Sequence, residues 1–214
     1  MPPVLICLPP AGAGPGLFRP WLREDPAVIA PSLPGREARF RETAPATLAA
    51  RADLLAAELA PRLPARYGLF GYSMGGTLAV LLAERLAARG LPEPEALFVL
   101  GALAPGRIAR GTERFRETDS AAFWEEIARL GGTPSEVLAD ADLRALFEPL
   151  LRQDFAACAA HRHDSGYRLR CPVEVLVARD DPILGPDSAG DWAAITKGPT
   201  RLHRLDGGHM LDPA

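Results

Sequence analysis

The chain has 214 residues, of which 48% are apolar and 24% are charged, and its formal net charge is −3. This composition excludes a disordered chain, and the small negative charge argues against a nucleic-acid partner. No stretch approaches the roughly 18 apolar residues of a membrane-spanning helix. The length predicts one domain over residues 1–214. Cys7, Cys158 and Cys171 are odd in number and widely spaced, which predicts reduced thiols in a cytoplasmic protein rather than disulfides or zinc ligands.

Strand and helix signals alternate along the first part of the chain. Residues 4–8 form an apolar run that predicts a strand, without the basic leader of a signal peptide. A loop rich in Gly and Pro follows at 9–16, and a second short strand is expected at 27–30. Residues 46–59 have helical composition, which stops at Pro61.

The most informative segment is Gly71-Tyr72-Ser73-Met74-Gly75, which joins a strand predicted at 68–71 to a helix predicted at 75–89. Flanking glycines allow a sharp turn that exposes the serine hydroxyl, and a helix N-terminus places partial positive charge beside an oxyanion. We therefore expect Ser73 to be a nucleophile, with a serine in an ordinary turn as the alternative. Another buried strand is predicted at 96–100.

The pattern changes between residues 105 and 168, where no strand is predicted. Asp119 and Ser120 are suitable caps for a helix over 121–130, and leucines spaced by three and four residues after Ser135 predict a helical pair. A helical insertion between two strands is a candidate lid over a binding site. The alternative is a packed helical subdomain that does not move.

Regular alternation returns after the insertion. A strand is predicted at 173–177, a helix at 188–195 and a last strand at 201–205. Strands that alternate with helices predict an α/β fold with a mostly parallel sheet and helices on both faces. No internal repeat or low-complexity linker divides the chain.

An activated serine needs a base, and the chain has four histidines. His209 follows the last predicted strand after a glycine pair, from which an imidazole can swing over the edge of the sheet. We therefore expect His209 to be the base. We expect His203 to be a half-exposed strand residue, and His161 and His163 to be solvated or packed within the insertion.

The carboxylate that orients this histidine should follow the strand at 173–177. Asp180 and Asp181 compete for the role, Asp187 is a distant third, and general chemistry does not separate the first two. The aspartate that is not used would stabilise the turn or cap a helix. The order Ser, Asp, His along the chain is typical of an α/β-hydrolase.

A tetrahedral oxyanion needs two backbone N–H donors. Met74, directly after the serine, supplies one, and the loop after the first strand should supply the other. Pro10 has no N–H, so Ala11 or Gly12 should be that donor, and of the two we expect Ala11. A phosphate-binding loop is the alternative, but the Lys-Ser/Thr ending of a P-loop and the dinucleotide glycine spacing are both missing. The predicted chemistry requires no metal or organic cofactor.

Several segments together resemble the type II thioesterases, the free-standing editing enzymes of nonribosomal peptide and polyketide synthases. The two most specific ones contain Pro34-Gly35-Arg36-Glu37 and Leu151-Arg152-Gln153-Asp154-Phe155. The matching segments are 7–13, 18–21, 33–40, 69–76, 130–134, 150–155, 180–182 and 207–209. The likeness spans nearly the whole chain.

This resemblance implies an α/β-hydrolase fold in which residues 105–168 form a helical lid over an acyl pocket. It implies Ser73 as nucleophile and His209 as base. It favours Asp181 over Asp180, because the family acid stands just before the proline. It also implies a partner, an acyl or peptidyl carrier protein, from whose phosphopantetheine arm the enzyme hydrolyses misprimed or stalled acyl groups.

The chain departs from the family pattern at two places. The family usually has a histidine or another polar or aromatic residue where Pro10 stands. Its members usually continue past the position of Ala214 into a further helix, and without that helix we expect exposed apolar surface beside His209.

Other functions share parts of this pattern. A carboxylesterase or lipase would use the same three residues, and a product-releasing or fatty-acyl thioesterase would differ in its acyl group. A non-catalytic relative that only binds a synthase is disfavoured because all three residues are present. A candidate docking surface for an acidic carrier comprises Arg107, Arg110, Arg114 and Arg116. Ordinary solvated surface is the preferred interpretation of these arginines.

Overall fold

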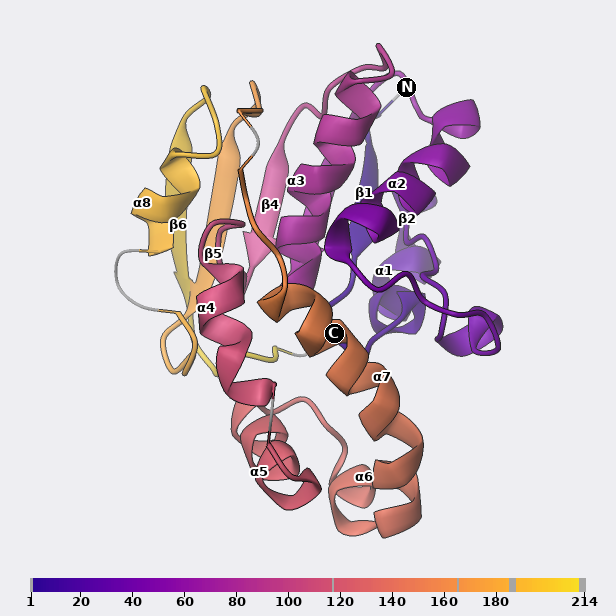
Figure 1. Ribbon diagram of the computed structural model, residues 1–214. Coiled ribbons are helices and arrows are strands. Elements are labelled where there is room, and N and C mark those ends of the chain that lie inside the picture. Colours follow the sequence, from indigo (N-terminus) through magenta and orange to yellow (C-terminus); the bar gives the residue numbers. More distant parts are fainter. Residues whose placement is uncertain (1, 117, 165, 185–187, 212–214) are drawn as a thin grey trace.

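A computed structural model describes residues 2–116, 118–164, 166–184 and 188–211 (Figure 1). Its centre is a six-stranded sheet in the order β2-β1-β3-β4-β5-β6, and every neighbouring pair is parallel. The strands are β1 (Val4–Leu8), β2 (Val28–Ile29), β3 (Tyr67–Tyr72), β4 (Leu97–Leu100), β5 (Val173–Ala178) and β6 (Thr200–Leu205). All strands predicted from the sequence are therefore present, and the α/β class with a parallel sheet is confirmed.

Helices cover both faces of this sheet (Figure 1). They are α1 (Arg19–Glu24), α2 (Leu48–Leu59), α3 (Met74–Ala87) and α8 (Ser188–Ala193). Because side chains alternate along a strand, Ile6 and Leu69 join one core with α2, α3 and α8. Cys7 and Phe70 point to the opposite face, where the ring of Trp21 on α1 lies 5.1 Å from that of Phe70.

Local chemistry explains where the helices begin. The Thr47 side chain accepts a hydrogen bond from the Ala50 N–H at 3.1 Å, so α2 begins at Leu48, two residues later than predicted. Asp119 caps α5 in the same way, by accepting from the Ala122 N–H at 2.9 Å. Of the two caps predicted for this helix, Asp119 is therefore in place, whereas Ser120 is the first residue of α5 and its hydroxyl donates to Glu148 Oε2.

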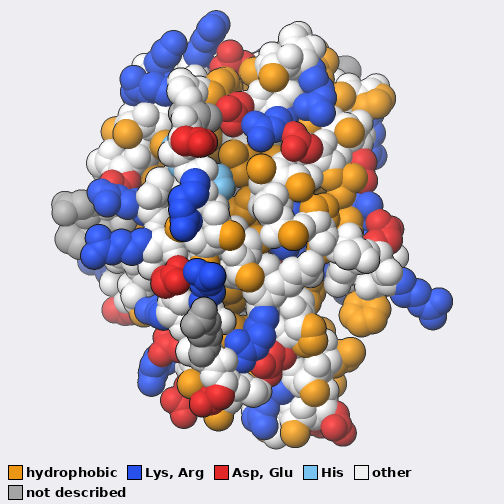
Figure 2. All heavy atoms as spheres, in the orientation of Figure 1, with side chains coloured by type: hydrophobic (Ala, Val, Ile, Leu, Met, Phe, Trp, Pro, Cys, Tyr) orange, Lys and Arg blue, Asp and Glu red, His pale blue; other side chains and the backbone are white. Residues whose placement is uncertain are grey.

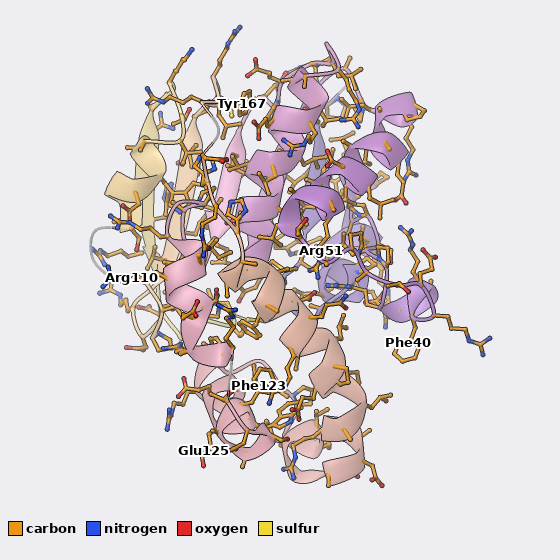
Figure 3. All side chains as sticks on the ribbon, in the orientation of Figure 1. Phe40, Arg51, Arg110, Phe123, Glu125 and Tyr167 are labelled. Carbon is orange, nitrogen blue, oxygen red and sulfur yellow. The ribbon has the colours of Figure 1, made fainter. Side chains whose placement is uncertain are left out.

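The segment between β4 and β5 forms a helical layer beyond the end of the sheet (Figure 1). Its helices are α4 (Ile108–Thr112), α5 (Ser120–Leu130), α6 (Ser135–Ala139) and α7 (Ala141–Ala159). No strand occurs in the described part of 105–168, as predicted. An aromatic core joins these helices: Phe115 and Phe155 stack at 4.0 Å, and Phe123 lies between α5 and α7 (Figure 3). The insertion is therefore a packed unit with its own core.

We expect the cysteines of the native protein to react slowly with disulfide reagents. Cys7, Cys158 and Cys171 are free and buried. Burial raises the pKa of Cys7 to about 12 and that of Cys171 to about 11, so reactive thiolate is scarce near neutral pH. Ellman's reagent should detect almost no thiol before denaturation and all three thiols after it. Fast reaction of the native protein would contradict this burial.

No helix in the described ranges combines the length and the apolar character that spanning a bilayer requires.

Candidate active site

Ser73 occupies the sharp turn between β3 and α3. Its backbone has φ 50° and ψ −114°, and residues other than glycine rarely adopt a positive φ. The Ser73 N–H donates to the carbonyl oxygen of Leu100 on β4 at 2.8 Å, which ties the turn to the neighbouring strand. The predicted strand, turn and helix are therefore present around Ser73.

The glycines beside this turn are required by close backbone approach. A Cβ atom on Gly75 would lie 2.2 Å from the carbonyl oxygen of Leu8 on β1. A Cβ atom on Gly71 would lie 2.4 Å from the carbonyl oxygen of Gly75. The backbone cannot yield easily at these contacts, because both partners belong to the sheet or to the turn itself.

Replacing Gly75 with Ala should therefore destabilise the fold by about 1–3 kcal/mol and lower activity with it. Gly106→Ala is the matched control, since Gly106 is exposed and a Cβ atom there would have nothing within 4 Å. Urea unfolding of the two variants and the parent measures the effect. Equal stability of the two variants would show that the turn tolerates a side chain.

The structure brings Ser73, His209 and Asp181 together. His209 Nε2 lies 3.1 Å from Ser73 Oγ, and His209 Nδ1 lies 2.8 Å from Asp181 Oδ2. The side chains of His209 and Asp181 are 2% and 0% exposed. The other carboxylate oxygen of Asp181 accepts from the N–H groups of Ile183 and Leu184 at 2.8 and 3.3 Å. These donors stabilise a buried carboxylate, which in turn holds the Nδ1–H tautomer and leaves Nε2 facing the serine.

The neighbouring acid Asp180 does not contact the histidine side chain. Asp180 has an exposed side chain, and its backbone N–H donates to the Gly207 carbonyl oxygen at 3.0 Å. It thus belongs to the turn that supports the His209 loop, while Asp181 contacts the histidine itself. Asp187 lies outside the described residues.

The other three histidines are not at this site. His203 is half-exposed on β6, where its Nε2 lies 2.7 Å from Glu174 Oε2. His161 and His163 follow α7 and line a different surface hollow, together with Glu84 and Arg85 of α3.

One residue of the site, Tyr72, was not identified from the sequence. The Tyr72 hydroxyl donates to the carbonyl oxygen of His209 at 3.0 Å, and so anchors the loop that carries the imidazole. Burial raises the pKa of Tyr72 to about 12, so this hydroxyl stays protonated as a donor. An aromatic residue at the end of a buried strand gave no signal for this role, because most such residues serve only the core.

An apolar cavity of about 280 Å³ opens at Ser73 and His209. The insertion provides most of its lining: Trp124, Ile127, Leu130, Val137, Phe147, Leu150, Leu151 and Phe155. A smaller cavity of about 20 Å³ lies at Ser73 with Met74 and Ala11, and Ala11 borders both cavities. Met74 is the first residue of α3, so its N–H has no partner within the helix. Both expected oxyanion donors therefore lie beside the serine, and their roles stay predictions.

The arginines near the insertion are mostly paired with acids of the same chain. Guanidinium nitrogens of Arg107, Arg114 and Arg116 lie within 4 Å of Asp191, Glu126 and Glu113, respectively. Basic and acidic side chains are interspersed over the face drawn in Figure 2 rather than gathered in one basic patch. This arrangement favours ordinary solvated surface. In the described part of the chain, no three His, Cys, Asp or Glu side chains are grouped to hold a metal ion.

Comparison with known proteins places this site in a family. The model of the thioesterase domain matches residues 3–211. The chain therefore belongs to the thioesterase family and is a hydrolase of the serine type.

Individual relatives show which kinds of thioesterase this chain resembles. The chain is similar to RedJ, a thioesterase from the prodiginine pathway of Streptomyces coelicolor, with a TM-score of 0.87 and 34% identity over 97% of this chain and 82% of that one. It is also similar to YbtT, a type II thioesterase from the yersiniabactin NRPS/PKS pathway, with a TM-score of 0.82 and 28% identity over 97% and 85%. A third relative is the medium-chain S-acyl fatty acid synthase thioesterase of Rattus norvegicus, 30% identical over 96% of this chain and 80% of the relative. The resemblance to type II thioesterases and the α/β-hydrolase fold are thus confirmed.

Proposed function

We propose that this thioesterase hydrolyses acyl groups from the phosphopantetheine arm of acyl or peptidyl carrier proteins, and so clears misprimed or stalled polyketide and nonribosomal peptide synthases. The observation that carries the proposal is the hydrogen-bonded series Ser73, His209, Asp181, of which Ser73 and His209 line an apolar cavity. The similarity of this chain to YbtT supports polyketide and nonribosomal peptide synthases as the systems it serves. The three buried free cysteines support a cytoplasmic location.

The first half of the proposed reaction acylates the enzyme. His209 Nε2 accepts the proton of Ser73 Oγ as that oxygen attacks the thioester carbonyl carbon. The N–H groups of Met74 and Ala11 stabilise the oxyanion that forms. The C–S bond then breaks, the pantetheine sulfur leaves with the proton from His209, and the acyl group stays on Ser73.

The second half returns the free enzyme. His209 accepts a proton from a water molecule, whose oxygen attacks the acyl-serine carbonyl carbon. A second tetrahedral oxyanion forms at the same donors and collapses as the proton passes from His209 to Ser73 Oγ. The products are a free acid and the unmodified serine. Asp181 stays ionised throughout and stabilises the imidazolium in both halves.

The chemistry of the cavity supports an acyl substrate. Its lining has few polar side chains, so the alkyl part of an acyl group leaves water on entering it. Helices α5, α6 and α7 supply this lining, and residues 105–168 are accordingly proposed to act as the lid of the acyl pocket. The same lining would also accept a fatty acyl chain, so a fatty-acyl thioesterase, as in the Rattus norvegicus relative, is the second candidate.

The test is a panel of thioesters with short, medium and long acyl chains on purified phosphopantetheinyl carrier proteins. The same acyl groups are supplied as simple alkyl esters. The proposal predicts a higher kcat/KM for carrier thioesters than for the matched esters. Preference for the esters would indicate a carboxylesterase, and hydrolysis confined to long fatty acyl chains would favour the second candidate.

A further inference from the structure

Three distant segments meet at the buried carboxylate of Asp154, on α7. Asp154 Oδ1 accepts hydrogen bonds from Arg36 Nη2 at 3.0 Å and from Arg51 Nη1 at 2.6 Å. Asp154 Oδ2 accepts from the backbone N–H of Gly12 at 2.8 Å. The side chains of Asp154 and Arg51 are 0% exposed and that of Arg36 is 2% exposed. One carboxylate of the insertion thus joins α2, the loop after β1 and the segment around Arg36.

These contacts fix the peptide groups of the loop. The N–H of Gly12 is committed to Asp154, and the carbonyl oxygen of Ala13 accepts from Arg36 Nη1 at 3.0 Å. Gly12 has φ +77°, so the chain turns sharply there. No hydrogen bond engages the Ala11 N–H within the described ranges, and Ala11 borders the cavities at Ser73. Of the two candidate donors in this loop, Ala11 is therefore the one whose N–H is free.

We propose that Asp154, held by Arg36 and Arg51, is a positioning residue: by binding the Gly12 N–H it sets the loop so that the Ala11 N–H meets the oxyanion. The inference rests on the proposed function and adds a role for two sequence segments. Arg36 lies in the Pro34-Gly35-Arg36-Glu37 segment and Asp154 in the segment at 150–155, and both act on the loop without contacting the substrate.

The same cluster reaches the other oxyanion donor. Arg51 Nη1 lies 3.5 Å from the sulfur of Met74, whose N–H begins α3 (Figure 3 labels Arg51). The cluster combines two guanidinium groups with one carboxylate, so it carries excess positive charge. A positioning role and a purely electrostatic role of Asp154 therefore predict opposite effects of its replacement on oxyanion binding. Asp154→Asn makes the cluster more positive, which would strengthen oxyanion binding if charge alone mattered, but it takes the carboxylate from the Gly12 N–H.

The experiment compares two inhibitors that share one alkyl chain. An alkyl trifluoromethyl ketone forms a serine adduct with an oxyanion, whereas a non-hydrolysable acyl thioether has no charge to stabilise. Asp154→Asn should lose about 10–100-fold in kcat and in affinity for the ketone, since one oxyanion donor contributes up to about 10²–10³-fold in kcat. KM and the affinity for the thioether should stay within about twofold of the parent.

A buried core variant separates positioning from loss of stability. Leu86→Ala, on α3, removes apolar contacts from a 0% exposed site outside the residues that line the cavities at Ser73. It should lower the melting temperature while leaving ketone affinity unchanged in the folded protein. Arg36→Gln is the second loop variant; it keeps the Asp154–Arg51 pair and should lose about 10-fold in ketone affinity by freeing the Ala13 carbonyl.

Parent-like ketone affinity in a folded Asp154→Asn variant, or in Arg36→Gln if the first does not fold, would overturn the inference. An equal loss of affinity for ketone and thioether would also overturn it, since it would indicate general disorder of the site. Failure of the proposed function looks different, because the parent enzyme would then hydrolyse the matched alkyl esters faster than the carrier thioesters, whatever happens at Asp154.

Discussion

Replacing Ser73 with Ala should lower kcat by about 10⁴-fold or more, because the variant lacks the nucleophilic oxygen that accepts the acyl group. Stability should change little, since the loss of one hydroxyl from a partly exposed turn leaves no cavity. The backbone strain at Ser73 stays, and alanine tolerates it no better than serine does. The measurement is steady-state hydrolysis of an acyl-carrier thioester, with a melting curve for each sample.

Ser135→Ala is the matched control, because Ser135 is an exposed serine at the start of α6. It should keep the kcat of the parent. A fluorophosphonate probe adds a second measure: the parent and the control should be labelled, and Ser73→Ala should not. Parent-like turnover by Ser73→Ala would rule out Ser73 as the nucleophile.

Asp181→Asn and Asp180→Asn should differ by about 10⁴-fold in kcat, although the residues are neighbours. Asp181 Oδ2 holds the Nδ1–H of His209, and an amide nitrogen there would favour the tautomer whose Nε2 cannot accept the serine proton. Among the described residues, the hydrogen bond of Asp180 within the turn is made by its backbone N–H, which asparagine preserves. Rates for the two variants, measured with the same carrier thioester, decide between the two acids.

Both variants should fold, because asparagine matches aspartate in size. An Asp181→Asn variant with parent-like kcat, or an Asp180→Asn variant that loses as much, would contradict the placement of the acid. The melting temperature serves as the control, since a loss of kcat without a loss of stability points to the histidine rather than to the turn.

Local sequence patterns accounted for much of the fold. Strands β1, β4 and β5 consist mostly of apolar residues. Thr47 and Asp119 mark helix starts through bonds to backbone only three residues away. The pentapeptide around Ser73 could be interpreted because close backbone approach demands glycine at Gly71 and Gly75. These signals are short-range, so a single sequence contains them in full.

The remaining features depend on contacts between distant segments. Residues alone did not separate Asp180 from Asp181, because the choice depends on which side chain turns toward a loop 28 residues away. Tyr72 and Asp154 gave no signal of their own, since each acts through partners more than 100 residues distant in the sequence. The choice of Ala11 over Gly12 gained a physical reason only once the partner of the Gly12 N–H was known.

Trapping the acyl-enzyme tests the central claim most directly. The protein is mixed with an acyl-pantetheine thioester, quenched within milliseconds, and examined by intact-mass and peptide mass spectrometry. A mass increase equal to the acyl group, located on Ser73 and absent from Ser73→Ala, is the predicted result. Thioester hydrolysis that proceeds with no acylated protein, or with the acyl group on another residue, would contradict the account.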